Sequence, residues 1–152
     1  MAATLLRDFL CSFIATVFFA VLFSAPRRAV FFSAFIAAVG WVIASAIRMQ
    51  GLSEYLGYFV GMLFVSVFSE LGARHYRMPS IIIFFPALIP FIPGFGIYNS
   101  MFYLVKKNYD LFIPALVQTL LTAASIAVAM AVVNIFFSLK RKKESTNDRS
   151  EQ

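Results

Sequence analysis

Runs of about 20 apolar residues, separated by short polar or basic turns, dominate the hydrophobic pattern of this chain. About 20 apolar residues is the length that a helix needs to cross the hydrocarbon core of a bilayer. Strict alternation with a period of two, which marks the strands of an outer-membrane barrel, does not occur. The pattern therefore predicts an all-α polytopic membrane protein. The five expected spans cover residues 9–25, 29–47, 53–72, 80–105 and 111–139.

The fourth span contains no charged side chain, yet prolines and glycines interrupt it. Proline removes a backbone donor and clashes with the preceding turn, so we expect two half-helices around Ile92–Ile97. Unpaired backbone survives at membrane depth only where it is buried in protein or lines a wet cavity. Broken helices also hold the substrates of secondary transporters. The residues that we therefore expect near a substrate are Pro86, Pro90, Pro93, Gly94, Gly96, Tyr98 and Asn99.

The start of the second half-helix is expected to bind negative charge. Its free amides carry partial positive charge, which suits a carboxylate. The alternative interpretation is a merely kinked helix, whose freed carbonyls are satisfied by neighbouring helices. Three prolines and two glycines within eleven residues favour the broken helix.

Acidic residues lie near both ends of the third span. Glu70 and Arg74 stand four residues apart, which places them on one helix face with the acid first. An ionisable pair at membrane depth suggests a gating or coupling role, and interfacial anchoring is the alternative. Glu54, at the other end, is interpreted as a solvated helix start.

A polar stripe follows one face of the fifth span, formed by Gln118, Thr122 and Ser125. We expect this stripe to face protein or a pathway rather than lipid, as helix contacts or, alternatively, as ligand contacts. Gly57 and Gly61 form a small-xxx-small pair, which predicts close packing of two helices.

The net charge of +6 does not indicate a nucleic-acid-binding protein, because the basic residues lie between and after the apolar runs. With five spans, nine Lys and Arg residues fall on one side of the membrane and four on the other. The positive-inside rule then places the C-terminus in the cytoplasm and the N-terminus outside. The polar tail, residues 140–152, is expected to be cytoplasmic and disordered beyond its first few residues.

No spacing of residues predicts an enzyme, a metal site or a cofactor. The sequence shows neither a nucleophile and base pattern nor a cluster with metal-ligand spacing. Cys11 lies in an apolar run and is expected to be buried and inert. His75, the one histidine, is expected in a turn without metal-binding partners.

Residues 69–101 resemble the threonine/serine exporter family, in its small type of membrane subunit. The resemblance lies in a basic turn followed by a proline and glycine pattern. Its positions are Glu70, Ala73, Arg74, Pro79, Ser80, Pro86, Ile89, Pro90, Pro93, Gly94, Gly96 and Tyr98. Further similarity lies in the first loop and second span, at Pro26, Arg27, Gly40 and Trp41.

This resemblance implies one subunit of a secondary transporter in the inner or plasma membrane, driven by the proton-motive force. In the family, such a five-helix unit works with a larger membrane subunit to export small polar metabolites such as threonine and serine, or in some members a dicarboxylate. A homo-oligomer is another assembly that so small a bundle allows. Phe95, where many members have a small residue, would narrow the substrate pocket. The alternative function is a non-transporting assembly subunit that stabilises the larger partner.

Overall fold

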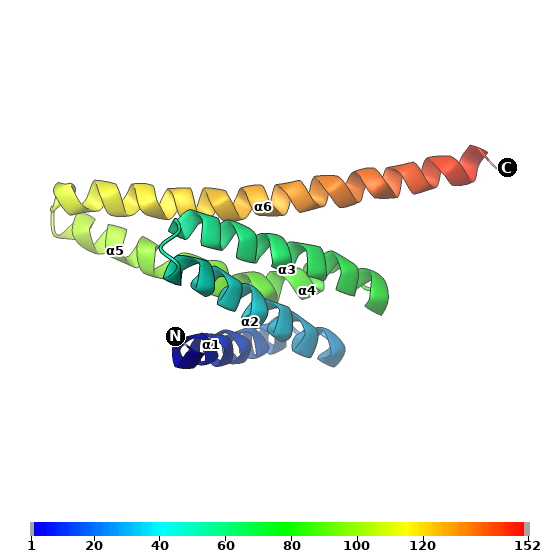
Figure 1. Ribbon diagram of the computed structural model, residues 1–152, viewed down its shortest axis with the longest axis horizontal. Helices are drawn as coiled ribbons and strands as arrows, with labels where there is room; N and C mark the ends of the chain where they lie inside the picture. The colour runs from blue at the N-terminus through cyan, green and yellow to red at the C-terminus, as the bar shows by residue number, and fades with distance from the viewer. Residues whose placement is uncertain (1, 151–152) are drawn as a thin grey trace.

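The computed structural model describes the backbone of residues 2–150 and the side chains of residues 3–140, and every element in it is helical. The predicted all-α class is confirmed. In chain order the helices are α1 (Ala2–Leu22), α2 (Arg27–Met49), α3 (Glu54–Tyr76), α4 (Ser80–Leu88), the 3₁₀ helix η1 (Ile89–Phe91), α5 (Gly94–Val105) and α6 (Tyr109–Ser150). Figure 1 shows α1 to α4 gathered in a bundle, with α5 paired along the first part of α6.

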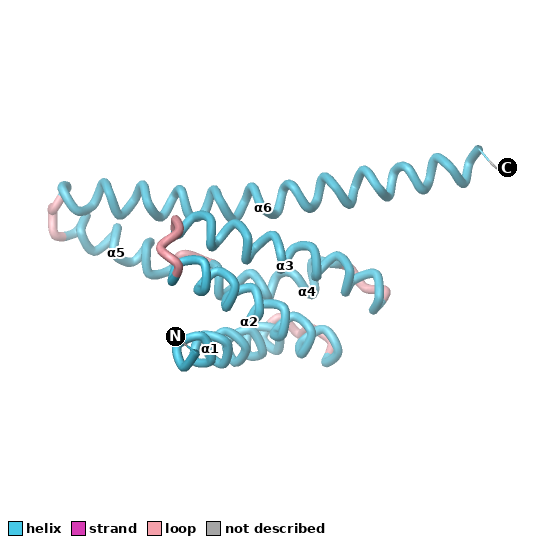
Figure 2. Tube along the Cα trace, viewed as in Figure 1, coloured by secondary structure: helices cyan, strands magenta, loops and turns pink. Residues whose placement is uncertain are grey.

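Four of these helices are long and apolar enough to cross a membrane: α1, α2, α3 and α6. Residues 80–91, which form α4 and η1, and residues 94–105, which form α5, pass the same test when they are taken together. The two segments are bent by 48° relative to each other. The turn before α4 and the turn after α5 lie at opposite ends of the molecule (Figure 2). The chain therefore has four or five candidate membrane-spanning elements, depending on whether this bent pair counts as one span, and the protein is a multi-pass membrane protein.

The turn between α3 and α4 is fixed by backbone geometry. Arg77 ends α3 in the left-handed conformation, with φ 54° and ψ 44°. The N–H of Met78 donates to the carbonyl of Ala73 at 3.0 Å, which satisfies an orphan carbonyl at the helix end. Pro79 then precedes α4 in an extended conformation. This turn directs the chain into the broken span.

Glycines bring α2 and α3 into backbone contact. A Cβ atom at Gly61 would lie 2.7 Å from the carbonyl oxygen of Gly40, and one at Gly57 would lie 2.8 Å from that of Ala44. Only small residues allow such an approach between membrane helices. The close packing predicted from Gly57 and Gly61 is confirmed.

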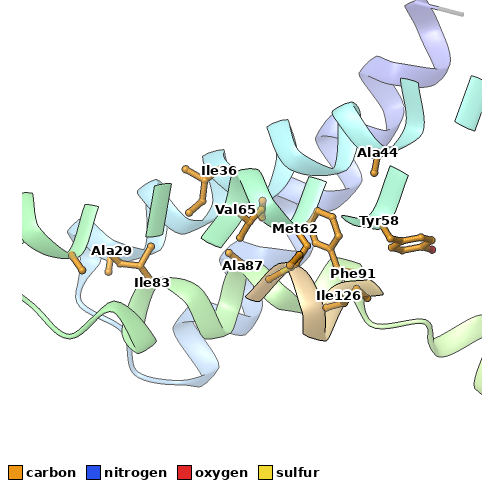
Figure 3. Close-up of a cluster of buried hydrophobic side chains, with 13 residues drawn as sticks. Ala29, Ile36, Ala44, Tyr58, Met62, Val65, Ile83, Ala87, Phe91 and Ile126 are labelled. Atoms are coloured by element: carbon orange, nitrogen blue, oxygen red, sulfur yellow. The ribbon is translucent and has the colours of Figure 1, made fainter. Parts of the chain in front are cut away.

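The two halves of the broken span differ in burial. Phe91 of η1 is fully buried with Met62 and Val65 of α3, and it packs edge-on against Trp41 at 5.5 Å (Figure 3). In α5, by contrast, Ser100 is the one residue classed as buried. The first half therefore belongs to the core, and the second half forms an outer wall.

Two expectations about the surface are wrong. Cys11 is exposed, because α1 packs on the bundle with one side and only 17% of its span is buried. The backbone remains helical to Ser150, where disorder was expected beyond the first residues of the tail. The tail has no Pro or Gly and is rich in Lys, Arg and Glu, which favour helix.

Candidate substrate site

The break in the fourth span lies at Ile92 and Pro93, between η1 and α5. Pro86 lies inside α4, Pro90 lies inside η1, and Pro93 directly precedes α5. The predicted interruption is therefore too long, because α5 already begins at Gly94. A proline just before a helix costs no hydrogen bond, so α5 starts immediately after the third proline.

The first turn of α5 presents backbone donors. The N–H of Gly94 donates to the Ile92 carbonyl at 2.7 Å, and that of Ile97 donates to the Pro93 carbonyl at 3.1 Å. The amides between them, in the first turn, have no carbonyl one turn earlier in the same helix. Their partial positive charge suits a negatively charged group.

A cavity of about 400 Å³ lies beside this break, and we call it the break cavity. It lies between the end of α2, the start of α3, the start of α5 and the first part of α6. Its polar lining consists of Arg48, Glu54, Tyr58, Asn99, Gln118, Thr119 and Thr122. Its other lining residues are Trp41, Ile92, Pro93, Gly94, Phe95, Gly96 and Ala115.

Arg48 is held in place by aromatic rings at the end of α2. Its guanidinium carbon lies 5.1 Å from the ring centroid of Trp41 and 5.4 Å from that of Tyr58. Its Nη2 donates to the hydroxyl of Ser45 at 3.0 Å, and its Nη1 lies 3.8 Å from Oε1 of Glu54. Cation–π contacts fix the side chain, and a guanidinium has five N–H donors, so donors remain for a ligand carboxylate.

Glu54 connects α3 with both neighbouring helices. Besides its contact with Arg48, its Oε2 accepts a hydrogen bond of 2.8 Å from Nε2 of Gln118 on α6. Glu54 is therefore not simply a solvated helix start. It places a carboxylate in the cavity, where it can bind a positively charged group.

The helices α5 and α6 meet closely at Gly96 and Thr119. A Cβ atom at Gly96 would collide with the Thr119 hydroxyl, whereas one at Gly94 would meet nothing within 4 Å. The hydroxyls of Thr119 and Thr122 donate to carbonyls one turn earlier, at 2.7 and 2.9 Å. Their oxygen atoms still have lone pairs, so both can accept hydrogen bonds from a ligand.

A family description, Threonine/Serine exporter, ThrE, matches residues 8–136 of the chain. The chain belongs to the threonine/serine exporter family. The match includes every residue that lines the break cavity. Since the members of this family are transporters and not enzymes, this chain is a membrane transport protein. No solved structure matches the chain.

The residues predicted to lie near the substrate, together with those of the predicted polar stripe, lie partly together in this exporter-family chain. The predicted residues that line the break cavity are Pro93, Gly94, Gly96, Asn99, Gln118 and Thr122. The other four lie outside its lining: Pro86, Pro90, Tyr98 and Ser125. Tyr98 stacks on Phe102 at 6.1 Å and is 64% exposed, because it lies on the outer face of α5. Pro86 is buried in the core.

No site role was predicted from the sequence for six further lining residues: Trp41, Arg48, Glu54, Tyr58, Ala115 and Thr119. Arg48 was considered only as a cation that sets membrane topology. A spacing signal was nevertheless present, since Trp41 and Arg48 stand seven residues apart and Glu54 and Tyr58 stand four apart. Both intervals place residues on one helix face.

The predicted gating pair lies at the other end of α3, 16 residues from Glu54 along the sequence, which is about 24 Å of helix. Glu70 is buried and Arg74 is exposed, with the Arg74 guanidinium 4.9 Å from the ring centroid of Phe137. Both line a second cavity of about 540 Å³, together with Arg77. Their gating role stays a prediction.

Proposed function

We propose that this chain is a subunit of a secondary transporter that exports small amino acids such as threonine and serine, or related small carboxylates. We further propose that the break cavity holds the substrate. One observation carries the proposal: an arginine, a carboxylate and a helix N-terminus meet in one cavity between membrane helices. Arg48 and Glu54 lie at the facing ends of α2 and α3, and together with the first-turn amides of α5 they offer binding groups for charges of both signs.

An α-amino acid suits this cavity because it carries one charge of each sign. Its carboxylate would bind Arg48 and the first-turn amides of α5. Its ammonium group would bind Glu54, and a side-chain hydroxyl would have Thr119 and Thr122 as partners. A dicarboxylate would place its second negative charge beside Glu54. The arrangement therefore favours amino acids over dicarboxylates.

A second membrane subunit is proposed to close the cavity on its outer side. The α5 wall is one helix thick, and Phe95 and Tyr98 on it are 79% and 64% exposed. Only 28% of the α6 span is buried, against 56% for α3. A polar cavity behind such a wall needs a further protein surface to separate it from lipid. This need supports the larger subunit implied by the family resemblance.

The C-terminus is proposed to lie in the cytoplasm. The N-terminus and the turns at residues 50–53 and 106–108 lie toward the same side of the molecule, with the 106–108 turn projecting furthest, and the C-terminus lies at the opposite end (Figure 1). The C-terminal end has most of the Lys and Arg residues, which the positive-inside rule places in the cytoplasm. A C-terminal fusion to green fluorescent protein is expected to fluoresce, whereas a dark fusion made at full length would contradict this orientation.

Transport into inside-out vesicles tests the proposed site. The vesicles come from cells that express the chain with a larger subunit of the family, and uptake of radiolabelled threonine is measured. Arg48→Gln and Glu54→Gln each remove one charged hydrogen-bonding group worth about 1.5–3 kcal/mol, so uptake at low substrate is expected to fall about tenfold or more. Arg7→Gln is the control, because Arg7 is 72% exposed and lies on α1, which contributes no residue to the lining of the cavity.

Immunoblots of both subunits must accompany every variant, so that lost expression is not counted as lost transport. Unchanged uptake in Arg48→Gln and Glu54→Gln vesicles would exclude the break cavity as the substrate site. Full transport by the larger subunit alone would instead assign this chain the role of an assembly subunit.

A further inference from the structure

A second polar site lies at the other end of the contact between α3 and α6. Its inner part is a cavity of about 120 Å³ with the polar lining residues Ser66, Ser69, Glu70, Ser80 and Asn134. Glu70 and Ser80 also line the outer cavity of about 540 Å³, which includes Arg74 and Arg77. We call these two adjoining cavities, which share Glu70, Ser80 and Ile81 in their linings, the Glu70 cavity.

The inner part offers hydrogen-bonding groups without partners. Ser66 is 5% exposed and Ser69 is 1% exposed, and neither hydroxyl has a hydrogen-bond partner among the described residues. Buried hydroxyls in native proteins are nearly always paired, and leaving one unpaired destabilises the fold. Glu70, which lines the same cavity, is 9% exposed. A ligand with several N–H donors, such as an ammonium group, would bind the carboxylate and both hydroxyls at once.

The Glu70 cavity has the same kinds of groups as the break cavity. Each contains a carboxylate and at least one arginine, one side-chain amide and two hydroxyls. In the break cavity these are Glu54, Arg48, Gln118, Thr119 and Thr122, and in the Glu70 cavity they are Glu70, Arg74, Asn134, Ser66 and Ser69. Two sites with the same groups can bind the same class of ligand.

One row of side chains on α6 connects the two sites. Gln118 and Thr122 line the break cavity, and Met130 and Asn134 line the Glu70 cavity. Ile126 lies between these pairs and is buried. Each of the five residues stands four positions after the one before, so successive side chains are neighbours in a row that winds gradually around the helix.

An apolar barrier separates the two cavities. Met62 and Phe91 are fully buried and belong to the same core cluster as Ile126. Figure 3 shows Met62 beside Phe91, with Ile126 below them. The route along α3 and α6 is therefore closed between the cavities in this conformation.

We infer that the Glu70 cavity is a second binding station for the same zwitterionic amino acid. Glu70 with Ser66 and Ser69 binds the ammonium group, and Arg74 with Arg77 binds the carboxylate in the outer part. The substrate then crosses in two steps, one on each side of the apolar barrier. This inference rests on the proposed function of the break cavity.

Protection of the two glutamates from chemical modification tests the two stations separately. Dicyclohexylcarbodiimide modifies carboxyl groups in apolar surroundings, and peptide mass spectrometry measures the modification of Glu54 and of Glu70 independently. The sample is membrane vesicles that contain the chain and a larger subunit. L-threonine at constant ionic strength is expected to slow the modification of both. Combining Ser66→Ala with Ser69→Ala should raise the threonine concentration for half-protection of Glu70 about tenfold, with Glu54 unaffected.

Ser12→Ala is the matched control, because the Ser12 hydroxyl is also buried without a partner among the described residues but lies on α1. This variant should leave the protection of both glutamates unchanged. Protection of Glu54 alone would overturn the second station and leave the proposed function standing. Protection of Glu70 by sodium chloride in place of threonine would overturn it too, since the site would then bind a cation. Protection of neither glutamate would contradict both proposals.

Discussion

At the scale of the residue, the break cavity combines charged groups that are positioned but only weakly bound to each other. The Arg48 and Glu54 side chains are 3.8 Å apart and remain partly exposed, at 29% and 38%. A pair of this kind contributes at most about 1 kcal/mol to stability. A zwitterion can therefore separate the two side chains at little cost and bind each charge, while the aromatic rings keep the guanidinium in place.

Gly96→Ala is expected to destabilise the contact between α5 and α6 by about 1–3 kcal/mol, because the new methyl group would collide with the Thr119 hydroxyl. The melting temperature of the detergent-solubilised protein measures this effect. Gly94→Ala is the matched control, since a Cβ atom there meets nothing within 4 Å. Adding Thr119→Ala to Gly96→Ala should restore most of the loss. Equal losses at the two glycines would contradict the close approach.

At the scale of the element, the broken span joins two helices with different tasks. The α4 and η1 half packs on α2 and α3, whereas α5 packs mainly on α6. The bend of 48° lets Phe91 enter the core while α5 leaves it. A straight helix could not do both. The break therefore brings the first turn of α5 into the lining of the cavity.

Pro93→Ala is expected to reduce this bend, because the new amide can donate to the carbonyl four residues earlier and continue the helix. Ile81 and Met101, which are both exposed, are each replaced by a cysteine that carries a spin label. Pulsed electron paramagnetic resonance should then measure a longer distance between the two labels. The background carries Cys11→Ser. Uptake of threonine should also fall in this variant, because the bend is smaller. Pro26→Ala, in the turn before α2, should change neither quantity, and an unchanged distance in Pro93→Ala would contradict this account.

At the scale of the whole molecule, the sequence predicted an all-helical multi-pass membrane protein and which apolar segment is broken. Apolar length alone determines the first, and three closely spaced prolines determine the second. It could not predict that Arg48 and Gln118 would meet around one carboxylate, because they are 70 residues apart and only the packing of α2, α3 and α6 brings them to Glu54.

Burial was also poorly predicted, for a physical reason. Side chains that face lipid are as apolar as those that face the protein core, so hydropathy does not separate the two. Cys11 shows this, since its apolar neighbours belong to a helix that is mostly on the outside. The same limit applies to Tyr98, whose polar hydroxyl suggested a site contact although the ring lies on the outer face of α5.

The proposed function depends above all on Arg48 binding the carboxylate of an amino acid in the break cavity. The most direct test is the binding of radiolabelled L-threonine to the purified complex of this chain with a larger subunit, measured by equilibrium dialysis. Arg48→Gln is expected to raise the dissociation constant for L-threonine about tenfold or more, while Arg7→Gln leaves it unchanged. Equal affinity for threonine in Arg48→Gln and in the unmodified complex would contradict it.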